Sequence, residues 1–396
     1  MTNDLVEFAT DTDVFLLIGT NTSECHPIIA MQMQRGLQRG AKMIVVDPKR
    51  TDMAKKADIH LQIPIGANIK TLNTMMNVII AENLQDTEFI EKYSEGFEYL
   101  KEAVKDFTPE RFERETGIKK ELIIEAARMY AKAGTAAICY TMGITQFSDG
   151  TSNVFSLSNL AVLTGNLGKK GAGVNPLRGQ NNVQGACDMG ALPNVIPAGA
   201  VNSPYAQEQA RKVWHFELNP VPGFKLTQAP DKMDSGELKV LYVYGENPVM
   251  SDPWTEHFVH AVHHLDCFIV QDLFFTESAH KADVVLPAAG WGEKDGTFIN
   301  TSRRVQRTRK ASEPVSGVEP DWKVVCNIAN RMGLEGFDFA SPEQIWNEIR
   351  ELMPKFFGGI SYYRLGKLGG ISWPCPDEAS WYARALRRSQ VHAAWR

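Results

Sequence analysis

One arginine in this 396-residue sequence stands among residues suited to binding a small anion. Arg178 lies in a tract from Gly165 to Gly190 that holds seven glycines, and it is followed by Gly179, Gln180 and further amides. A guanidinium group can hold a planar carboxylate through two parallel hydrogen bonds. The other interpretation is an arginine that ties loop carbonyls together, and the spacing does not decide between the two. Long loops of this kind are usually functional, so we expect a binding site here.

Two other stretches repeat an order of elements that is typical of nucleotide-binding proteins. The first has an apolar run closed by Gly19, a helical stretch over 27–39, and a second apolar run closed by Asp47. The same order recurs between Gly245 and Asp272. In βαβ units that bind nucleotides, the glycine forms the tight turn and the acid binds a ribose hydroxyl. Two such units suggest two nucleotide groups around one cleft. A parallel sheet without a ligand has the same turns and acids, so both interpretations stay open.

Neither unit contains the GxGxxG or GxxxxGK[ST] pattern. An ordinary NAD site and a P-loop are therefore disfavoured. The order of elements predicts an α/β protein with two Rossmann-like domains, mainly parallel sheets and a smaller C-terminal appendage. Proline-rich connections mark a seam between the two domains. We expect the domains to cover 1–180 and 181–290, followed by a smaller segment over 291–396 whose tail is atypical after residue 375.

Composition excludes several classes of partner. The chain has 42 basic and 47 acidic residues and a net charge of -5, which gives no reason to expect nucleic-acid binding. Its apolar runs are far shorter than the roughly 20 residues that span a bilayer, and the N-terminus lacks the features of a signal peptide. We therefore expect no membrane segment and a cytoplasmic location.

The sequence has six cysteines and no C-x-x-C pair, which excludes a local zinc or iron–sulfur knuckle. We interpret the six cysteines as structural, small buried hydrophobes.

The glycine-rich tract also resembles a known family. The segment RGQNNVQGACDMGALP, preceded by LTGNLGKKGAGVNPLRG, is similar to the catalytic (alpha) subunit of molybdenum- or tungsten-dependent formate dehydrogenases, members of the molybdopterin oxidoreductase family. The resemblance runs from about Asp13 to Cys375. Further matching stretches are IGTNTSECHP, VVDPKRT, GANI, MGITQF, GENP, IVQDLFFTE, ADVVLPAAGWGEKDGTFINTSRRVQ and LGGISWPCP.

The resemblance implies a reaction and a cofactor. The reaction is oxidation of formate to carbon dioxide, with two electrons passed to a molybdenum or tungsten centre held by bis(molybdopterin guanine dinucleotide). Arg178 then orients formate and Gln180 supplies a neighbouring polar contact. The cofactor contacts that the resemblance implies are Asn21, Glu24, Asp47, Lys49, Gly66, Asn68, Gly143, Gln146, Gly245, Asn247, Gln271, Asp272 and Asp321. Relatives often carry Arg where this chain has Lys49 and Asp where it has Asn247.

The resemblance also implies regions that this sequence does not contain. The four-cysteine iron–sulfur region of the family, its selenocysteine or cysteine metal ligand and its last dinucleotide-binding domain have no counterpart here. We expect a central fragment that holds no metal ligand and is inactive in isolation, with the iron–sulfur cluster in the missing N-terminal region. The expected partners are formate and the iron–sulfur or diaphorase subunits of an electron-transfer complex. The alternative is a catalytically inactive cofactor-binding fragment or a truncated gene product.

Two further groups of residues receive simpler interpretations. His257, His260, His263 and His264 are expected on a solvated helix face, because the sequence supplies no fitting fourth metal ligand. The basic run from Arg303 to Lys310 is expected on a solvated strand, although its resemblance to a family segment also allows a place near the cofactor.

The topology of parallel sheets predicts where the binding loops meet. Ligands of open α/β sheets lie outside the carboxyl ends of the strands. We therefore expect the loops at 19–24 and 245–248 to face one crevice, with Arg178 near its floor.

Overall fold

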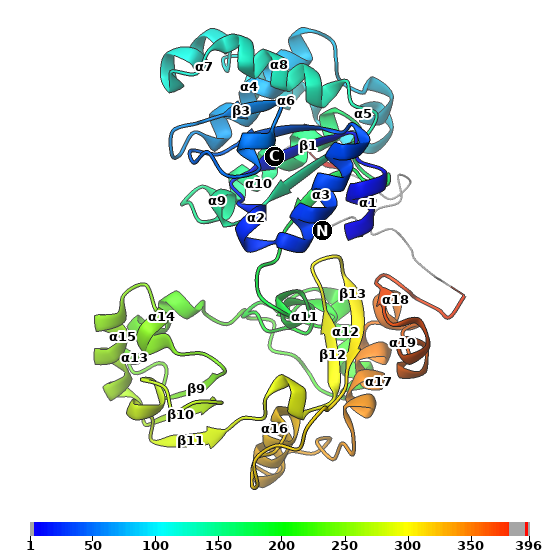
Figure 1. Cartoon of the computed structure of the whole chain (residues 1–396). Helices are drawn as coiled ribbons and strands as arrows, with labels where there is room; N and C mark the ends of the chain where they lie inside the picture. Colours follow the sequence, from blue (N-terminus) through cyan, green and yellow to red (C-terminus); the bar gives the residue numbers. More distant parts are fainter. Residues whose placement is uncertain (1–3, 380–392, 395–396) are drawn as a thin grey trace.

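A five-stranded parallel sheet forms the centre of the N-terminal half. The computed structural model describes residues 4–379 and 393–394 (Figure 1). The strands lie in the order β3-β2-β1-β5-β6, and every neighbouring pair is parallel. Their bounds are β1 (Val14–Ile18), β2 (Lys42–Val46), β3 (Ile59–Leu61), β5 (Ala136–Tyr140) and β6 (Gly173–Pro176). The parallel α/β fold expected from the sequence is confirmed for this part, which we call the N-terminal unit together with its helices.

Helices cover both faces of this sheet, as expected for strands that are apolar at nearly every position. Successive side chains of β1 point to opposite faces: Phe15 and Leu17 join one buried cluster, and Leu16 and Ile18 join the other. The first cluster includes side chains of α1 (Leu5–Thr10) and α3 (Pro27–Arg39). The second includes side chains of α4 (Asn68–Ala81), α5 (Thr87–Tyr93), α6 (Phe97–Val104), α7 (Pro109–Thr116), α8 (Lys120–Ala131), α9 (Met142–Thr145) and α10 (Gly150–Leu163).

The order of strands reverses between β1 and β5. From β1 the chain steps outward to β2 and β3, and it then returns to place β5 on the other side of β1. Open α/β sheets bind ligands at such a reversal, because the loops after the two central strands turn in opposite directions there. The loop after β1 runs through Gly19 into α2 (Thr22–Cys25), and the loop after β5 runs into α9.

These two loops touch through their backbones. Gly19 has φ +57°, and a Cβ atom at this position would lie 2.6 Å from the carbonyl carbon of Gly143. The Gly143 N–H donates to the Gly19 carbonyl at 3.2 Å, and the Thr141 hydroxyl donates to the same carbonyl at 2.8 Å. Glycine is required at residue 19 both for its φ and for this close approach.

A second, smaller parallel sheet follows in the chain, in the order β11-β10-β9. We call it the second unit, with the helices that pack on it through a core that includes Met233, Phe258, Phe268 and Val270. Its elements are β9 (Val240–Tyr244), β10 (Cys267–Asp272), β11 (Val284–Pro287), α13 (Ala229–Asp234), α14 (Pro248–Ser251) and α15 (Thr255–Ala261), the last running into a 3-10 turn at Val262–His264.

The C-terminal part contains an antiparallel sheet in the order β12-β13-β14. Trp346 and Phe357 lie in its core, and the indole of Trp346 donates to the Ile360 carbonyl at 2.6 Å. The bounds are β12 (Gly296–Ile299), β13 (Arg304–Thr308), β14 (Ile371–Ser372), α16 (Asp321–Arg331), α17 (Pro342–Leu352), α18 (Pro354–Phe357) and α19 (Tyr362–Leu368). The remaining elements are α11 (Val183–Asp188), α12 (Pro204–Val213), β7 (Val195–Ile196), β8 (Gly199–Ala200), β4 (Ser94–Glu95), β15 (Ala393–Ala394) and the short 3-10 turns at Ala54–Lys56, Leu226–Gln228, Ala279–Lys281 and Trp291–Glu293.

The segment between the two parallel sheets does not join the second of them. Helices α11 and α12 lie beside β12 and α17 in Figure 1, and Ala206 of α12 packs against Leu352 of α17.

The domain boundaries expected at residues 180 and 290 stay a prediction. Most of the tail expected to be atypical lies outside the described residues. Within the part of the chain that is described, no helix is both long and apolar enough to cross a membrane.

Two expectations about surface and core need correction. Cys139, Cys326 and Cys375 are buried free thiols, as predicted, but Cys25 is exposed at the end of α2. The run from Arg303 to Lys310 does form a strand, yet it is not solvated throughout. Arg303 is buried and donates to the Trp373 carbonyl at 2.8 Å.

We predict that Gly19→Ala lowers the free energy of unfolding of the N-terminal unit by about 2–5 kcal/mol. Left-handed backbone costs about 1–2 kcal/mol, and the clash with Gly143 adds about 1–3 kcal/mol. Gly117→Ala is the matched control: Gly117 also has positive φ, but its added Cβ would meet no atom within 4 Å, so only the first cost of about 1–2 kcal/mol applies. Hydrogen–deuterium exchange of β1 and β5 measures both effects, and equal losses would contradict the close approach.

Candidate functional site

The loops after β1, β2, β3 and β5 enclose a cavity at the carboxyl edge of the N-terminal sheet. Its volume is about 350 Å³, and we call it the switch-point cavity. Five of the residues expected to contact a cofactor line it: Asn21, Asp47, Gly66, Asn68 and Gly143. The amide of Asn68, at the start of α4, donates to the Gly143 carbonyl at 3.3 Å. The structure therefore brings together residues that are as much as 122 positions apart in the chain.

The other expected contacts of this half lie beside the cavity. Glu24 and Lys49 form an exposed ion pair at 3.9 Å between the loop after β1 and the loop after β2. Gln146 is exposed directly after α9. Asp47 accepts the Lys49 backbone N–H at 2.8 Å, while burial raises the pKa of its carboxyl above the usual value.

Several buried polar atoms of the loop after β1 have no protein partner. The side-chain oxygens of Thr20, Asn21 and Thr22 are shielded from solvent and form no hydrogen bond with the described residues. Leaving such groups unpaired costs about 1–3 kcal/mol each. A polar ligand in the switch-point cavity would relieve this cost. Threonine hydroxyl groups can donate to phosphate oxygens, and the side-chain oxygen of Asn21 can accept from an N–H or O–H group. The residues therefore fit a nucleotide-like group.

Arg178 lies just beyond the end of β6, close to the same edge. Its backbone N–H donates to the Thr301 hydroxyl at 3.0 Å, and its carbonyl lies 3.1 Å from Nε2 of His26. Its guanidinium forms no hydrogen bond with the described residues, and Nε is buried. The interpretation of an arginine that ties loop carbonyls together therefore finds no support. Gln180 is exposed in the following turn.

His26 joins the loop after β1 to Arg178. It begins α3, it is buried, and its Nδ1 has no partner among the described residues. Burial holds the pKa of His26 below its usual value, against the opposite effect of the Arg178 carbonyl. Because a carbonyl oxygen only accepts, Nε2 donates in this contact. The sequence analysis did not single out this residue, although it lies within the matching stretch IGTNTSECHP.

A partly buried acid lies near Arg178. Asp188, the last residue of α11, accepts hydrogen bonds at 2.8 Å from Gln184 and from the indole of Trp373. Burial raises the pKa of Asp188 to about 6, while these hydrogen bonds and the charge of Arg178 act in the opposite direction. The glycine-rich tract thus carries a cation and an acid within electrostatic reach of each other.

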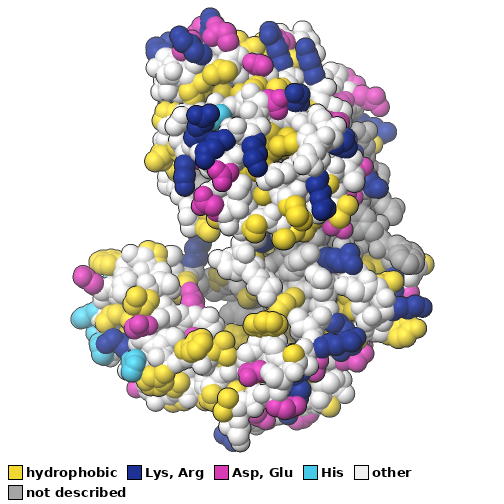
Figure 2. Space-filling view, in the orientation of Figure 1, with side chains coloured by type: hydrophobic (Ala, Val, Ile, Leu, Met, Phe, Trp, Pro, Cys, Tyr) yellow, Lys and Arg dark blue, Asp and Glu magenta, His cyan; other side chains and the backbone are white. Residues whose placement is uncertain are grey.

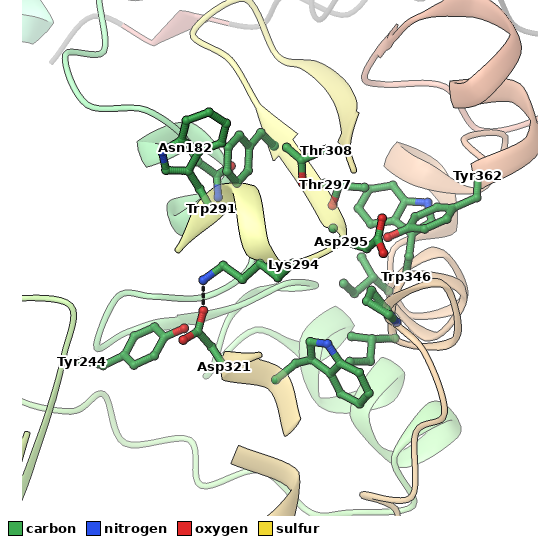
Figure 3. Close-up of a pocket in the computed structure, with 16 residues that line it drawn as sticks. Asn182, Tyr244, Trp291, Lys294, Asp295, Thr297, Thr308, Asp321, Trp346 and Tyr362 are labelled. Atoms are coloured by element: carbon green, nitrogen blue, oxygen red, sulfur yellow. Dashed lines mark hydrogen bonds and ion pairs between the residues drawn. The ribbon is translucent and has the colours of Figure 1, made fainter. Parts of the chain in front are cut away.

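In the second half, two of the expected residues form a hydrogen bond, and a lysine pairs with one of them. The Gln271 amide donates to Asp321 at 3.0 Å, and the Lys294 ammonium pairs with the other oxygen of Asp321. Figure 3 shows Lys294 and Asp321 in a cavity of about 320 Å³ that Tyr244, Trp291 and Trp346 also line. Burial lowers the pKa of Lys294. This lysine was not predicted, although it lies within the matching stretch ADVVLPAAGWGEKDGTFINTSRRVQ.

The remaining expected residues of this half form hydrogen bonds within the second unit. Gly245 donates its N–H to the Gln271 carbonyl at 2.9 Å. The Asn247 side chain accepts from the Ser278 hydroxyl at 2.7 Å and donates to Glu277 at 2.7 Å. Asp272 accepts the Leu273 and Phe274 N–H groups at 2.6 and 3.3 Å. Among the described residues, no hydrogen bond or ion pair joins these loops to Arg178, so the shared crevice stays a prediction.

The fold and the first of these sites define a class of protein: an α/β protein with Rossmann-like units and a polar cavity at a strand reversal. The sequence pattern of the molybdopterin oxidoreductase family matches residues 1–331, and the chain belongs to this family. Membership implies a molybdopterin cofactor, which the unpaired polar atoms of the switch-point cavity can accommodate.

Similar proteins carry related names. The F420-dependent formate dehydrogenase subunit alpha of Methanocaldococcus jannaschii is 50% identical over 96% of this chain and 56% of its own length. Formate dehydrogenase H of Escherichia coli is 44% identical over 93% of this chain and 51% of its own. The chain thus spans about half the length of these relatives. Acetylene hydratase from Pelobacter acetylenicus has the same fold, with a TM-score of 0.75 and 22% identity over 97% of this chain and 55% of its own.

We predict that acid destabilises the region around Arg178 through His26. Because the folded-state pKa of His26 is lowered, the unfolded chain binds more protons as pH falls through about 6.5, and stability is lost below that value. His26→Gln keeps a donor for the Arg178 carbonyl but does not titrate, so its stability should fall less between about pH 7 and pH 5. Thermal midpoints across this range, with hydrogen–deuterium exchange at 173–180, measure the difference. The variant His263→Gln, at an exposed position, should show the same dependence of the thermal midpoint on pH as the wild type. If His26→Gln also showed the wild-type dependence, His26 would not be the group that causes the loss of stability in acid.

Proposed function

We propose that this chain is the central part of the catalytic subunit of a formate dehydrogenase. The observation that carries the proposal is the 50% identity, over 96% of the chain, to a relative named as the alpha subunit of such an enzyme. The reaction is the oxidation of formate to carbon dioxide, which releases one proton and two electrons. The expected partners are formate and the iron–sulfur or diaphorase subunits that receive the electrons, and the expected location is the cytoplasm.

Arg178 is proposed to hold the formate carboxylate, with Gln180 as a polar neighbour. The guanidinium forms no hydrogen bond with the described protein, its Nε is buried, and its backbone is fixed on both sides by Thr301 and His26. A positioned guanidinium can donate to both carboxylate oxygens in one plane, which an ammonium cannot do. The partly buried acid Asp188 balances part of its charge.

The cofactor is proposed to be bis(molybdopterin guanine dinucleotide) with molybdenum or tungsten. When bound, its metal centre accepts the two electrons of formate. One dinucleotide would lie on Asn21, Glu24, Asp47, Lys49, Gly66, Asn68, Gly143 and Gln146. The other would lie on Gly245, Asn247, Gln271, Asp272 and Asp321, and Lys294 adds a cation there.

A second candidate function is cofactor binding without turnover by the chain as given. It is supported by the unpaired buried oxygens of Thr20 and Asn21, which suit a polar ligand whether or not a reaction follows. The two candidates agree on the cofactor residues and differ only in formate oxidation, so they are separated by assaying formate with an artificial dye.

We predict that Arg178→Lys lowers kcat/KM for formate about tenfold to 100-fold in the full-length protein that carries this chain. One charge-assisted hydrogen bond of about 1.5–3 kcal/mol is lost. Molybdenum or tungsten content should stay at the wild-type level. Arg331→Lys, at an exposed position near the end of α16, is the control and should keep full activity. Loss of cofactor together with activity would instead point to a structural role of Arg178.

We predict that Asp47→Ala reduces the cofactor content of the same full-length protein. Asp47 lines the switch-point cavity and its carboxylate is half-buried there. Asp52→Ala is the matched control, because Asp52 follows the same strand but is paired with Lys55 on the surface. The pterin released by denaturation, measured per mole of protein, should fall at least about tenfold for Asp47→Ala if one hydrogen bond to a charged group is lost. Equal pterin content in the two variants would remove Asp47 from the site.

A further inference from the structure

A cluster of histidines surrounds one aspartate on the surface of the second unit. Figure 2 shows histidine side chains gathered at the outer edge of this part of the molecule. Asp234 ends α13, His257 and His260 belong to α15, and His264 ends the 3-10 turn that continues α15. None of these residues takes part in the site described above.

The contacts in this cluster centre on the Asp234 carboxylate. Nε2 of His257 lies 2.8 Å from one oxygen, and Nδ1 of His264 lies 2.9 Å from the other. The rings of His260 and His264 lie 5.2 Å apart at an angle of 86°. One ligand atom each from Asp234, His260 and His264 lies within 4.8 Å of the other two.

The packing of two helices fixes this arrangement. His257, His260 and His264 follow one another at intervals of three and four residues, so they share one face of a helix. The buried side chains of Met233, Phe258 and Ala261 pack α13 against α15, and this places Asp234 beside that face. The sequence analysis found no fitting partner for the histidines, because Asp234 lies more than twenty positions before them and reaches them only through this packing.

We propose that Asp234, His260 and His264 form a binding site for a zinc-class divalent cation. Two imidazoles and one carboxylate are ligands that zinc accepts, and a fourth tetrahedral position would remain open to solvent. His257 is a positioning residue: it holds the second carboxylate oxygen and so directs the first toward the ion, as outer partners of metal sites do. Zinc takes a neutral imidazole, so the hydrogen bond between His264 and Asp234 gives way when the ion binds.

The test is a titration of the full 396-residue chain, without an affinity tag, with zinc alone after treatment with a chelator. Calorimetry should show one more zinc per chain in the wild type than in His260→Ala, His264→Ala or Asp234→Ala. His257→Ala should keep the site but weaken it by about tenfold. Cobalt should give the visible spectrum of a nitrogen- and oxygen-ligated ion without thiolate bands, and this spectrum should disappear in the same variants.

His263→Ala is the matched control, because His263 is an exposed neighbour that lies outside the cluster. It should bind zinc as the wild type does. Circular dichroism of the metal-free variants shows that each is folded, which the exposure of the ligands favours. The proposal would be overturned if the wild type bound no zinc, or if His260→Ala bound as much zinc as the wild type. It would also be overturned if His263→Ala lost as much zinc binding as His260→Ala. The result does not depend on formate oxidation, because neither formate nor the pterin enters the measurement.

Discussion

The carboxyl edge of the N-terminal sheet depends on a contact between two backbones. Gly19 and Gly143 approach so closely that a methyl group on either residue would overlap the backbone of the other. The contact brings the loop after β1 against the loop after β5 at the point where the strand order reverses. The switch-point cavity, its buried threonines and the start of α3 all take their positions from these loops. His26, and through it the Arg178 backbone, is fixed by the same arrangement.

The two halves of the proposed cofactor site differ in how their polar groups are satisfied. In the first half, oxygens of Thr20, Asn21 and Thr22 are buried without a partner among the described residues, so a ligand that reaches them gains hydrogen bonds there without displacing any. In the second half, Gln271 and Asp321 already bond each other, and Lys294 completes the group. A ligand there has to compete with existing contacts, which lowers its net gain. The first half therefore gains more hydrogen bonds from a bound cofactor than the second half does.

Regular elements of this protein could be predicted from apolar runs because the parallel strands are buried on both faces. The strand at Lys42–Val46 and the helix at Pro27–Arg39 have the predicted bounds. Strand β6 was missed, since Gly173 and Pro176 are poor strand formers; an edge strand tolerates them, and the amide of Asn175 ties it to the Ile138 carbonyl of β5. In the antiparallel sheet of the C-terminal part, the arginine-rich strand β13 was expected, but its pairing with β12 and with the distant β14 was missed. It was also expected to be solvated, whereas Arg307 stacks on Tyr362 with its guanidinium carbon 4.2 Å from the ring centre.

The sequence alone determined the family resemblance, the two parallel units and the glycine turns, because these depend on residues close together in the chain. Only the tertiary structure decided which polar groups meet. It placed His26 on Arg178, Lys294 on Asp321 and Asp234 among the histidines. Each of these pairs joins separate elements, and their contact is set by how buried apolar faces pack. A hydrophobic pattern gives the face of each element but not its neighbour, so such pairs could not be found from spacing.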